Sequence, residues 1–251
     1  PPSYWRREYG GLGLPLLRQI IWYEEYARAG APHVGAGMVG LNHGGPTLIT
    51  RASAEQKAFH LPKILRGEVV WCQGFSEPGA GSDLASLRTS GRIEGDHWVV
   101  NGQKIWTSYA HIADYQELLI RTDPDSTRHR GLTWVICDMR TPGITVRPIR
   151  NLVGEHHFNE VFYDEVRIPM ANVVGAVGEG WSVAMSTLGF ERGTAHARDQ
   201  IELSLELEKL IDWARSHPGP DGRGPAIGDA EFAARLATLR AEISALRSLV
   251  Y

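Results

Sequence analysis

The stretch Phe75-Ser-Glu-Pro-Gly-Ala-Gly-Ser-Asp83 decides how this chain is interpreted. Gly79 and Gly81 let the backbone bend so that amide groups converge, while Ser76 and Ser82 add short hydroxyls. Converging amides suit an anionic or carbonyl-rich ligand. The alternative is a tight structural turn, which residues 79–82 alone would favour. The stretch is neither a Gly-x-Gly-x-x-Gly dinucleotide motif nor a P-loop.

Composition sets the broad class around this stretch. The 251 residues are 43% hydrophobic and 22% charged, as in a globular chain with a sizeable core, and the net charge is −3. This balance argues against attraction to nucleic acid or anionic lipid, and the longest apolar runs have only strand length, so we expect no membrane span. Cys72 and Cys137 match no metal or redox motif, and we expect reduced core thiols in a cytoplasmic protein.

The hydrophobic period changes twice along the chain. The first third has helical spacing, with a capping box at Ser53 and Gln56 and a helix end expected near Pro62. From about residue 71 to 167 the signals are strands and turns. Residues 94–96 predict one turn and Asn101-Gly102 a second hairpin turn. Further strands are expected at residues 117–121, 132–138, 144–149 and 160–166, with a polar loop at 122–130. Such strands favour an antiparallel barrel or sandwich.

The last third is helical again. A long helix is expected from Trp181 to Trp213, then a loop at residues 217–225. Apolar side chains recur four and three apart beyond it, at Phe232, Leu236, Leu239, Ile243, Leu246 and Val250. This seam predicts burial in an antiparallel bundle, against missing helices or another subunit. Because the chain starts Pro1-Pro2 and stops inside this pattern, we expect that both ends are cut.

A second segment, Gly102-Gln-Lys-Ile-Trp-Thr-Ser108, follows the Asn-Gly pair. An aromatic and two hydroxyls in a row at a strand end can flank a planar ring and hydrogen-bond its edge. Taken alone, Trp106 is better explained as a core aromatic.

The two segments in this order resemble the acyl-CoA dehydrogenase family. Other stretches fit, among them Glu8-Tyr-Gly-Gly-Leu-Gly13, Gly178-Glu-Gly-Trp181 and Glu160-Val-Phe-Tyr-Asp-Glu-Val-Arg-Ile-Pro169. The resemblance covers nearly the whole chain. It implies an α+β fold in three parts: a partial N-terminal helical domain at residues 1–70, a middle antiparallel β-barrel at 71–175 that binds FAD and acyl-CoA, and the start of a C-terminal four-helix bundle at 176–251.

The resemblance also implies FAD as the cofactor and assigns the residues that would hold it. By position in the two segments, the residues expected to line the flavin are Gln73, Phe75, Ser76, Gly81, Ser82, Trp106, Thr107 and Ser108. Ser108 matches the hydroxyl that meets the flavin N5 edge, and Ser82 also matches a position near the CoA ester. Ser76 stands where the family more often has Thr, which keeps the hydroxyl.

The family's chemistry needs a base that removes a proton α to a thioester carbonyl. Glu191, immediately before Arg192, coincides with the site that a minority of members use, and Arg192 is expected to contact the substrate. The alternative is that Glu191 and Arg192 form a structural pair with no role in proton transfer. The base would then lie on a C-terminal segment that this chain does not contain, as in many members of the family. The family's Arg-x-x-Phe-Gly segment, which reaches the FAD of a neighbouring subunit, is missing at residues 216–224.

The resemblance therefore predicts an FAD-dependent acyl-CoA dehydrogenase subunit that desaturates an acyl-CoA to the trans-2-enoyl-CoA and passes electrons to an electron-transfer flavoprotein. We expect a homo- or hetero-oligomer and no metal, because His156-His157 lack a third ligand. Two alternatives stay open: a non-catalytic partner subunit of a heteromer, and an acyl-CoA oxidase or flavin monooxygenase on the same fold.

Overall fold

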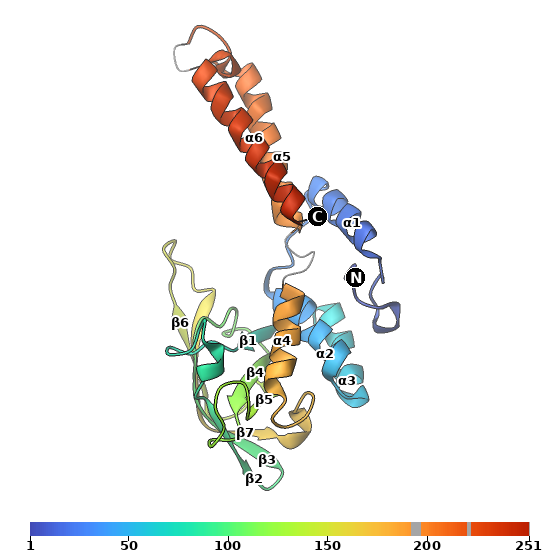
Figure 1. Cartoon of the computed structure of the whole chain (residues 1–251), viewed down its shortest axis with the longest axis vertical. Helices are drawn as coiled ribbons and strands as arrows, with labels where there is room; N and C mark the ends of the chain where they lie inside the picture. The colour runs from blue at the N-terminus through green and yellow to red at the C-terminus, as the bar shows by residue number, and fades with distance from the viewer. Residues whose placement is uncertain (192–196, 220–221, 251) are drawn as a thin grey trace. The chain divides into compact units, whose positions relative to one another are not determined.

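The computed structural model of the chain describes residues 1–191, 197–219 and 222–250 (Figure 1). These residues form two compact units. Unit 1 contains residues 1–2, 7–10 and 34–191, and unit 2 contains residues 3–6, 11–33 and 192–251. Each unit is described below by itself.

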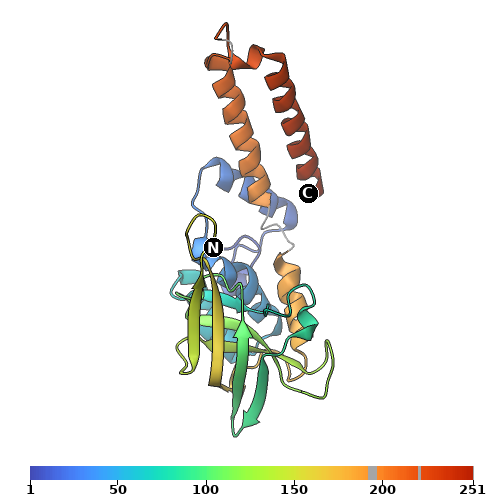
Figure 2. The same cartoon turned by 90° about the vertical axis from the view of Figure 1, so that its left-hand side faces the viewer.

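A sheet of seven strands forms the larger part of unit 1. The strands are β1 (Trp71–Gly74), β2 (Ser90–Glu94), β3 (His97–Lys104), β4 (Tyr115–Arg121), β5 (Leu132–Asp138), β6 (Ile144–Ile149) and β7 (Phe158–Pro169). Their order is β1-β4-β2-β3-β7-β6, and β5 also pairs with β4. Figure 2 shows β6, β7, β3 and β2 side by side at the front of the view. The sheet is mixed rather than wholly antiparallel, because β1 runs parallel to β4. The predicted fold class is confirmed, and this parallel pair is the detail that periodicity did not reveal.

The core of the sheet comes from alternate residues of its strands. Trp98, Leu118, Val135 and Val166 are at most 1% exposed and belong to one apolar cluster. Cys72 lies in the same cluster, and it and Cys137 are buried free thiols, as expected. Burial raises the pKa of Cys137 to about 12, so this thiol stays protonated at neutral pH.

One local prediction in the sheet was wrong. Asn101-Gly102 makes no hairpin turn. It lies inside β3, where the register with β7 shifts between Val100 and Gly102. Gly102 has φ of 149°, and a Cβ there would come within 2.6 Å of Thr89 Oγ1, so the glycine lets β3 pass close to Thr89, the residue before β2.

Unit 1 also contains short helices, and several of them pack on the sheet. They are η1 (Arg7–Tyr9), η2 (Gly35–Gly37), the π-helix η3 (Gly40–Gly44), α2 (Gly45–Arg51), α3 (Ala54–Arg66), η4 (Leu84–Ser86), η5 (Met170–Asn172) and α4 (Gly180–Glu191). The Ser53 and Gln56 capping box is confirmed. However, α3 passes through Pro62 and ends at Gly67, whose left-handed conformation closes the helix. Burial of Leu61 and Ile64 explains why the helix continues past the proline.

Close contacts fix these helices to the sheet and to each other. A Cβ at Gly44 would lie 3.1 Å from the Trp71 ring, so this glycine lets η3 pack directly on β1. The Thr47 and Thr187 hydroxyls hydrogen-bond at 2.8 Å and join α2 to α4. Unit 1 is therefore a helical layer fastened to a curled sheet, as Figure 1 shows for α2, α3 and α4.

Unit 2 contains α1 (Leu16–Arg28), α5 (Ala197–Ser216), η7 (Ala226–Gly228) and α6 (Ala230–Val250). Helix α6 packs on α5 through Leu236 and Ile243, which are 4% and 8% exposed. Leu239 and Leu246 of the predicted seam are 44% and 40% exposed. The predicted helix from Trp181 to Trp213 corresponds to α4 and α5, and residues 192–196 between them lie outside the described residues.

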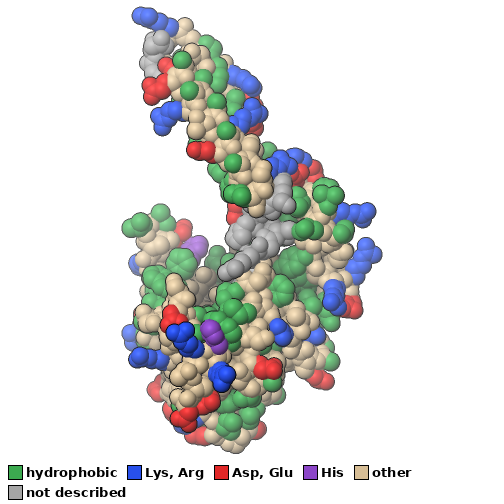
Figure 3. All heavy atoms as spheres, viewed as in Figure 1, with side chains coloured by type: hydrophobic (Ala, Val, Ile, Leu, Met, Phe, Trp, Pro, Cys, Tyr) green, Lys and Arg blue, Asp and Glu red, His purple; other side chains and the backbone are tan. Residues whose placement is uncertain are grey.

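The distribution of surface charge and the hydropathy of the helices agree with the small net charge and the short apolar runs of the sequence. Basic and acidic side chains are interspersed on the face shown in Figure 3. Within the described ranges, no helix is long and apolar enough to cross a lipid bilayer.

Candidate functional site

The two motif segments meet at the end of β1. Strand β3 runs directly into residues 105–108, and its last residue, Lys104, reaches across to the first segment. Three consecutive residues of that segment are fastened there. The Lys104 Nζ donates to the Phe75 carbonyl at 2.9 Å and to Glu77 Oε1 at 2.8 Å, and the Ile105 N–H donates to the Ser76 carbonyl at 2.9 Å. Tertiary structure thus brings together two stretches that are 27 residues apart.

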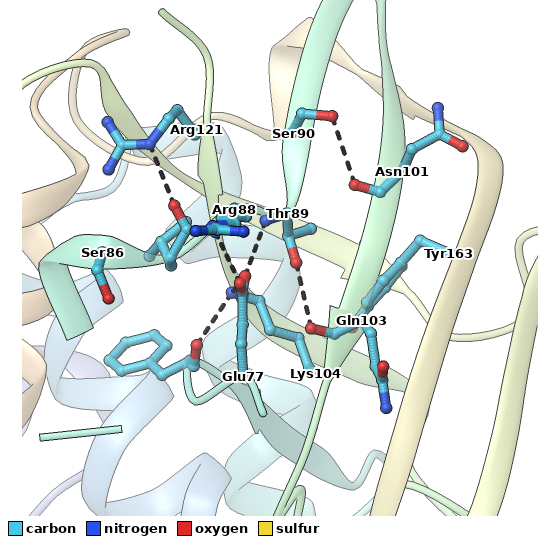
Figure 4. Close-up of polar contacts among 12 residues, drawn as sticks. Glu77, Ser86, Arg88, Thr89, Ser90, Asn101, Gln103, Lys104, Arg121 and Tyr163 are labelled. Carbon is cyan, nitrogen blue, oxygen red and sulfur yellow. Dashed lines mark hydrogen bonds and ion pairs between the residues drawn. The ribbon is translucent and has the colours of Figure 1, made fainter. Parts of the chain in front are cut away.

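Glu77 and Lys104 form a buried ion pair, with exposed fractions of 9% and 0% (Figure 4). The carboxylate also accepts from the Thr89 N–H at 2.9 Å and from the Arg88 N–H at 2.6 Å. A buried charge is tolerated only when such partners satisfy it. Glu77 therefore closes the loop between residues 77 and 89, which contains Gly81 and Ser82.

Burial and charge act in opposite directions on this pair. Burial lowers the pKa of Lys104 to about 8, with the Glu77 carboxylate working against that shift. Burial also works to raise the pKa of Glu77, but the Lys104 charge and the donated hydrogen bonds outweigh it, so that pKa lies below its usual range. Both groups are charged at neutral pH.

The glycine-rich loop is tightly turned and open to its surroundings. Glu77 and Ala80 exchange two backbone hydrogen bonds, at 2.9 and 3.0 Å. A Cβ at Gly79 or Gly81 would meet no atom of the described chain within 4 Å, and Ser82 is exposed. A ligand can therefore approach this backbone closely.

The second segment has an unusual backbone. Trp106 has φ of 60°, a left-handed conformation that is costly for a residue with a Cβ, and its side chain is 59% exposed. The next residue is held on both sides, since the Thr107 N–H donates to the Asn159 carbonyl at 3.0 Å and Asn159 Nδ2 donates to the Thr107 carbonyl at 3.1 Å. The two hydrogen bonds with Asn159 thus stabilise the backbone conformation that leaves the Trp106 side chain exposed.

Thr107 has a buried hydroxyl without a partner in the described residues. The residue is fully buried, yet its Oγ1 makes no hydrogen bond within the part of the chain that the structure describes. A buried polar atom without a partner is costly and uncommon in a native protein. Ser108, next along the chain, is half-buried and offers a second hydroxyl.

Gln73 lies on the helix-facing side of β1, beside a buried carboxylate. Its Nε2 donates to Glu117 Oε1 at 2.9 Å, and Glu117 is fully buried in the paired strand β4. The His43 Nδ1 of η3 lies 3.8 Å from the same oxygen. This polar cluster fixes the Gln73 amide and thereby orients it.

These features fit a flavin. An open glycine loop, an exposed tryptophan, a half-buried serine and an orphaned buried hydroxyl lie on segments that hydrogen bonds hold together. A large planar ring with polar atoms along its edge is the kind of ligand that such a set accommodates. Seven of the eight residues expected to line FAD are half-buried or exposed, or have an unsatisfied buried group; Phe75, the eighth, is buried at the anchored turn.

The expected catalytic residue and its neighbour are not tested by this geometry. Glu191 is the last residue of α4. Its side chain, and the whole of Arg192, lie outside the described residues. Both assignments stay predictions.

The histidines behave as expected from the sequence. His156 and His157 are exposed in the loop before β7, and His157 pairs with Glu155 at 3.0 Å. His111 joins them, with its ring 4.7 Å from that of His156. Across the described ranges, no cluster of His, Cys, Asp and Glu has the makings of a metal site.

Sequence reasoning missed Glu77, Lys104, Asn159 and Glu117 as parts of the site. One signal was available for Lys104, which has the same strand parity as the core residues Trp98 and Val100. A lysine in core phase requires a buried acceptor. Nothing in the sequence indicates which carboxylate supplies it.

Comparison with known proteins gives the same family. The chain matches the models for the acyl-CoA dehydrogenase N-terminal domain at residues 3–68, the middle domain at 72–166 and the C-terminal domain at 178–251. The chain belongs to the acyl-CoA dehydrogenase family.

Particular relatives include the acyl-CoA dehydrogenase IpdE1 of Mycobacterium tuberculosis, which is 45% identical over 221 residues, covering 86% of this chain and 56% of that protein. Among solved structures, the Tcur3481-Tcur3483 steroid ACAD has a TM-score of 0.86 at 35% identity, covering 98% of this chain and 61% of the other. The ChsE4-ChsE5 complex from Mycobacterium tuberculosis has a TM-score of 0.86 at 35% identity, with coverages of 98% and 62%. The chain spans little more than half the length of IpdE1.

Proposed function

We propose that this chain is part of an FAD-dependent acyl-CoA dehydrogenase that introduces a double bond between the α and β carbons of an acyl-CoA thioester, giving the trans-2-enoyl-CoA. The observation that carries the proposal is the convergence of the two motif segments. They are fastened at Phe75, Ser76 and Glu77, next to the chain that leads to the partnerless hydroxyl of Thr107.

The binding residues have distinct tasks in this proposal. Trp106 offers an exposed flat face to the ring system, and the Thr107 and Ser108 hydroxyls donate to its polar edge. Gln73, Phe75, Ser76, Gly81 and Ser82 line the other side. Ser82 also contacts the CoA thioester, where its exposed position leaves room for the substrate.

Glu191 acts as the base that removes the α proton, and Arg192 contacts the substrate. A carboxylate becomes an effective base when an apolar, dry surrounding raises its pKa towards the working pH. Leu188 and Phe190 are its apolar neighbours in sequence. Bound FAD would supply the hydride acceptor for the β carbon.

Two observations support a proposal for the substrate class. One of them is a steroid ACAD by title, and the stretch around Glu191 is rich in small residues, at Gly189, Gly193, Ala195 and Ala197. Small residues leave room for a bulky acyl group. We therefore propose a polycyclic, steroid-derived acyl-CoA as the substrate and an electron-transfer flavoprotein as the electron acceptor.

A second candidate function is a partner subunit in a mixed oligomer. It is favoured by the two-component titles of the Tcur3481-Tcur3483 and ChsE4-ChsE5 structures, and by the absence of Arg-x-x-Phe-Gly from residues 216–224. In that case a second chain would complete the flavin site or carry the base.

The test is an anaerobic absorbance titration of the full-length protein with steroid-derived and straight-chain acyl-CoAs. Wild type is expected to carry flavin that bleaches with a steroid-derived thioester. Glu191→Gln is expected to bind flavin without bleaching, whereas Glu206→Gln, at a carboxylate 68% exposed on α5, should behave as wild type. Undiminished bleaching by Glu191→Gln would rule out this base, and a wild type without flavin would favour the partner-subunit function.

A further inference from the structure

The buried pair of Lys104 and Glu77 has no contact that the reaction itself requires, yet it lies where the two flavin segments join. We propose that Lys104 and Glu77 are positioning residues for the cofactor, a clamp that sets the spacing between residues 75–77 and residues 104–108. The inference rests on the proposed function, because it assigns the clamp to the same FAD site.

Several hydrogen bonds converge on the turn at residues 75–77. One ammonium group bonds the carbonyl of Phe75 and the carboxylate of Glu77, on either side of Ser76. The carbonyl of Ser76 itself is held by the Ile105 N–H at 2.9 Å. Three residues in a row are thus fixed against two residues in a row, which leaves this turn little freedom to shift relative to β3.

Glu77 also binds the far end of the glycine-rich loop. Its Oε2 accepts from the Arg88 N–H and its Oε1 from the Thr89 N–H, so the same carboxylate closes the loop that carries Gly81 and Ser82 (Figure 4). Loss of Lys104 would leave a buried carboxylate with amide donors only. The loop and the turn would then relax together, because one group holds both.

The clamp is independent of the contacts that hold the rest of the second segment. The far end of the second segment has its own anchor, the paired backbone bonds between Thr107 and Asn159. Removing the Lys104 ammonium leaves that anchor in place. The expected result is an altered distance between two intact halves of the site and weaker flavin binding, within a chain that still folds.

The experiment measures FAD affinity and apoprotein stability separately in the full-length protein. Apoprotein is titrated with FAD by flavin fluorescence, and thermal unfolding of the apoprotein is followed by circular dichroism. Lys104→Met, which keeps length without charge, is expected to weaken FAD binding about 10- to 100-fold. Glu77→Gln should have a smaller effect, because Lys104 keeps its bond to the Phe75 carbonyl.

The double variant Lys104→Met/Glu77→Gln distinguishes positioning from a general loss of stability. It removes the buried carboxylate that has lost its cation, so its unfolding midpoint should lie closer to wild type than that of Lys104→Met. FAD binding should stay weak, because the Phe75 carbonyl still lacks the hydrogen bond from Lys104. Arg92→Met is the matched control, since Arg92 forms an exposed ion pair with Glu165 on the same sheet.

FAD affinity equal to wild type in Lys104→Met and in the double variant would disprove the clamp and leave the proposed function standing. Recovery of FAD affinity in parallel with the unfolding midpoint would overturn it as well, since stability would then explain both effects. If Lys104→Met does not fold, Glu77→Gln decides, and unchanged affinity there would sink the proposal. A wild-type apoprotein that binds no FAD would overturn the proposed function, and the clamp with it.

Discussion

Two groups of ion pairs that involve strands of the same sheet differ in solvent exposure, which largely sets how much an ion pair contributes to stability. Lys104 and Glu77 are shielded from solvent, with side-chain exposures of 0% and 8%, while Arg92 and Glu165 are 51% and 59% exposed. The exposed group has more members, since Glu94 pairs with both Arg92 and Arg167. In water such charges are already well solvated, so their pairing adds little. Burial, not the number of charges, decides which pair the fold depends on.

The largest expected effect comes from breaking the buried pair. Lys104→Met should lower the free energy of unfolding of the apoprotein by about 3–5 kcal/mol, because it leaves the Glu77 carboxylate buried without its cation. Urea denaturation of wild type and variant at pH 7 measures the difference. A loss as small as that of an exposed pair would contradict the role of burial.

His60 extends the comparison to a buried group that pairs with no opposite charge among the residues that the structure describes. It is 7% exposed and packs edge-on against Trp71 and Tyr115, and burial, with a smaller effect of Lys63, lowers its pKa from 6.5 to about 4. The unfolded chain takes up this proton near pH 6.5 and the folded chain only near pH 4. Neutral His60 therefore makes its full contribution to the free energy of unfolding above pH 6.5. That free energy falls by about 1–3 kcal/mol as the pH is lowered from 6.5 to 4.

The measurement is a series of urea denaturations between pH 4 and 7 on wild type and His60→Phe, which keeps an aromatic ring. The variant should lose less stability than wild type over this range. Parallel pH profiles for the two proteins would show that His60 is not the group responsible.

Thr107→Val sharpens the comparison by testing a buried polar group with no partner at all. Because Oγ1 makes no hydrogen bond in the described structure, valine should leave apoprotein stability unchanged or raise it by up to about 1 kcal/mol. FAD affinity should fall, since the hydroxyl is assigned to the flavin edge. Thr122→Val is a matched control, because that hydroxyl has a partner in Thr133 at 2.7 Å; it should lose stability and keep its FAD affinity.

The smallest effect is expected at the exposed pair. Arg92→Met should leave both the urea midpoint at pH 7 and the FAD affinity within error of wild type, because solvent screens the charges that it removes. A clear loss of stability would mean that the surface group acts as a cooperative network. The difference in stability loss between Arg92→Met and Lys104→Met would then be smaller than expected.

Most of the fold could be predicted from the sequence, because local patterns determine it. Strand-length segments between turn signals located β5 and β6 with the observed bounds, and the capping box gave the start of α3. The errors came where a local signal was overruled by packing. Asn101-Gly102 serves a close approach of β3 to Thr89, and α3 continues past Pro62, with Leu61 and Ile64 buried on either side of the proline. The proposed division at residues 70 and 175 stays a prediction.

By itself, the sequence determined the family and which segments form the candidate site, because both motifs are short and contiguous and their residue types carry the chemistry. Tertiary structure alone decided how those segments are held. The partners of Lys104 and Thr107 lie 27 and 52 residues away. Their pairing depends on strand register and on the need to satisfy every buried charge and amide, conditions that exist only once the chain is folded.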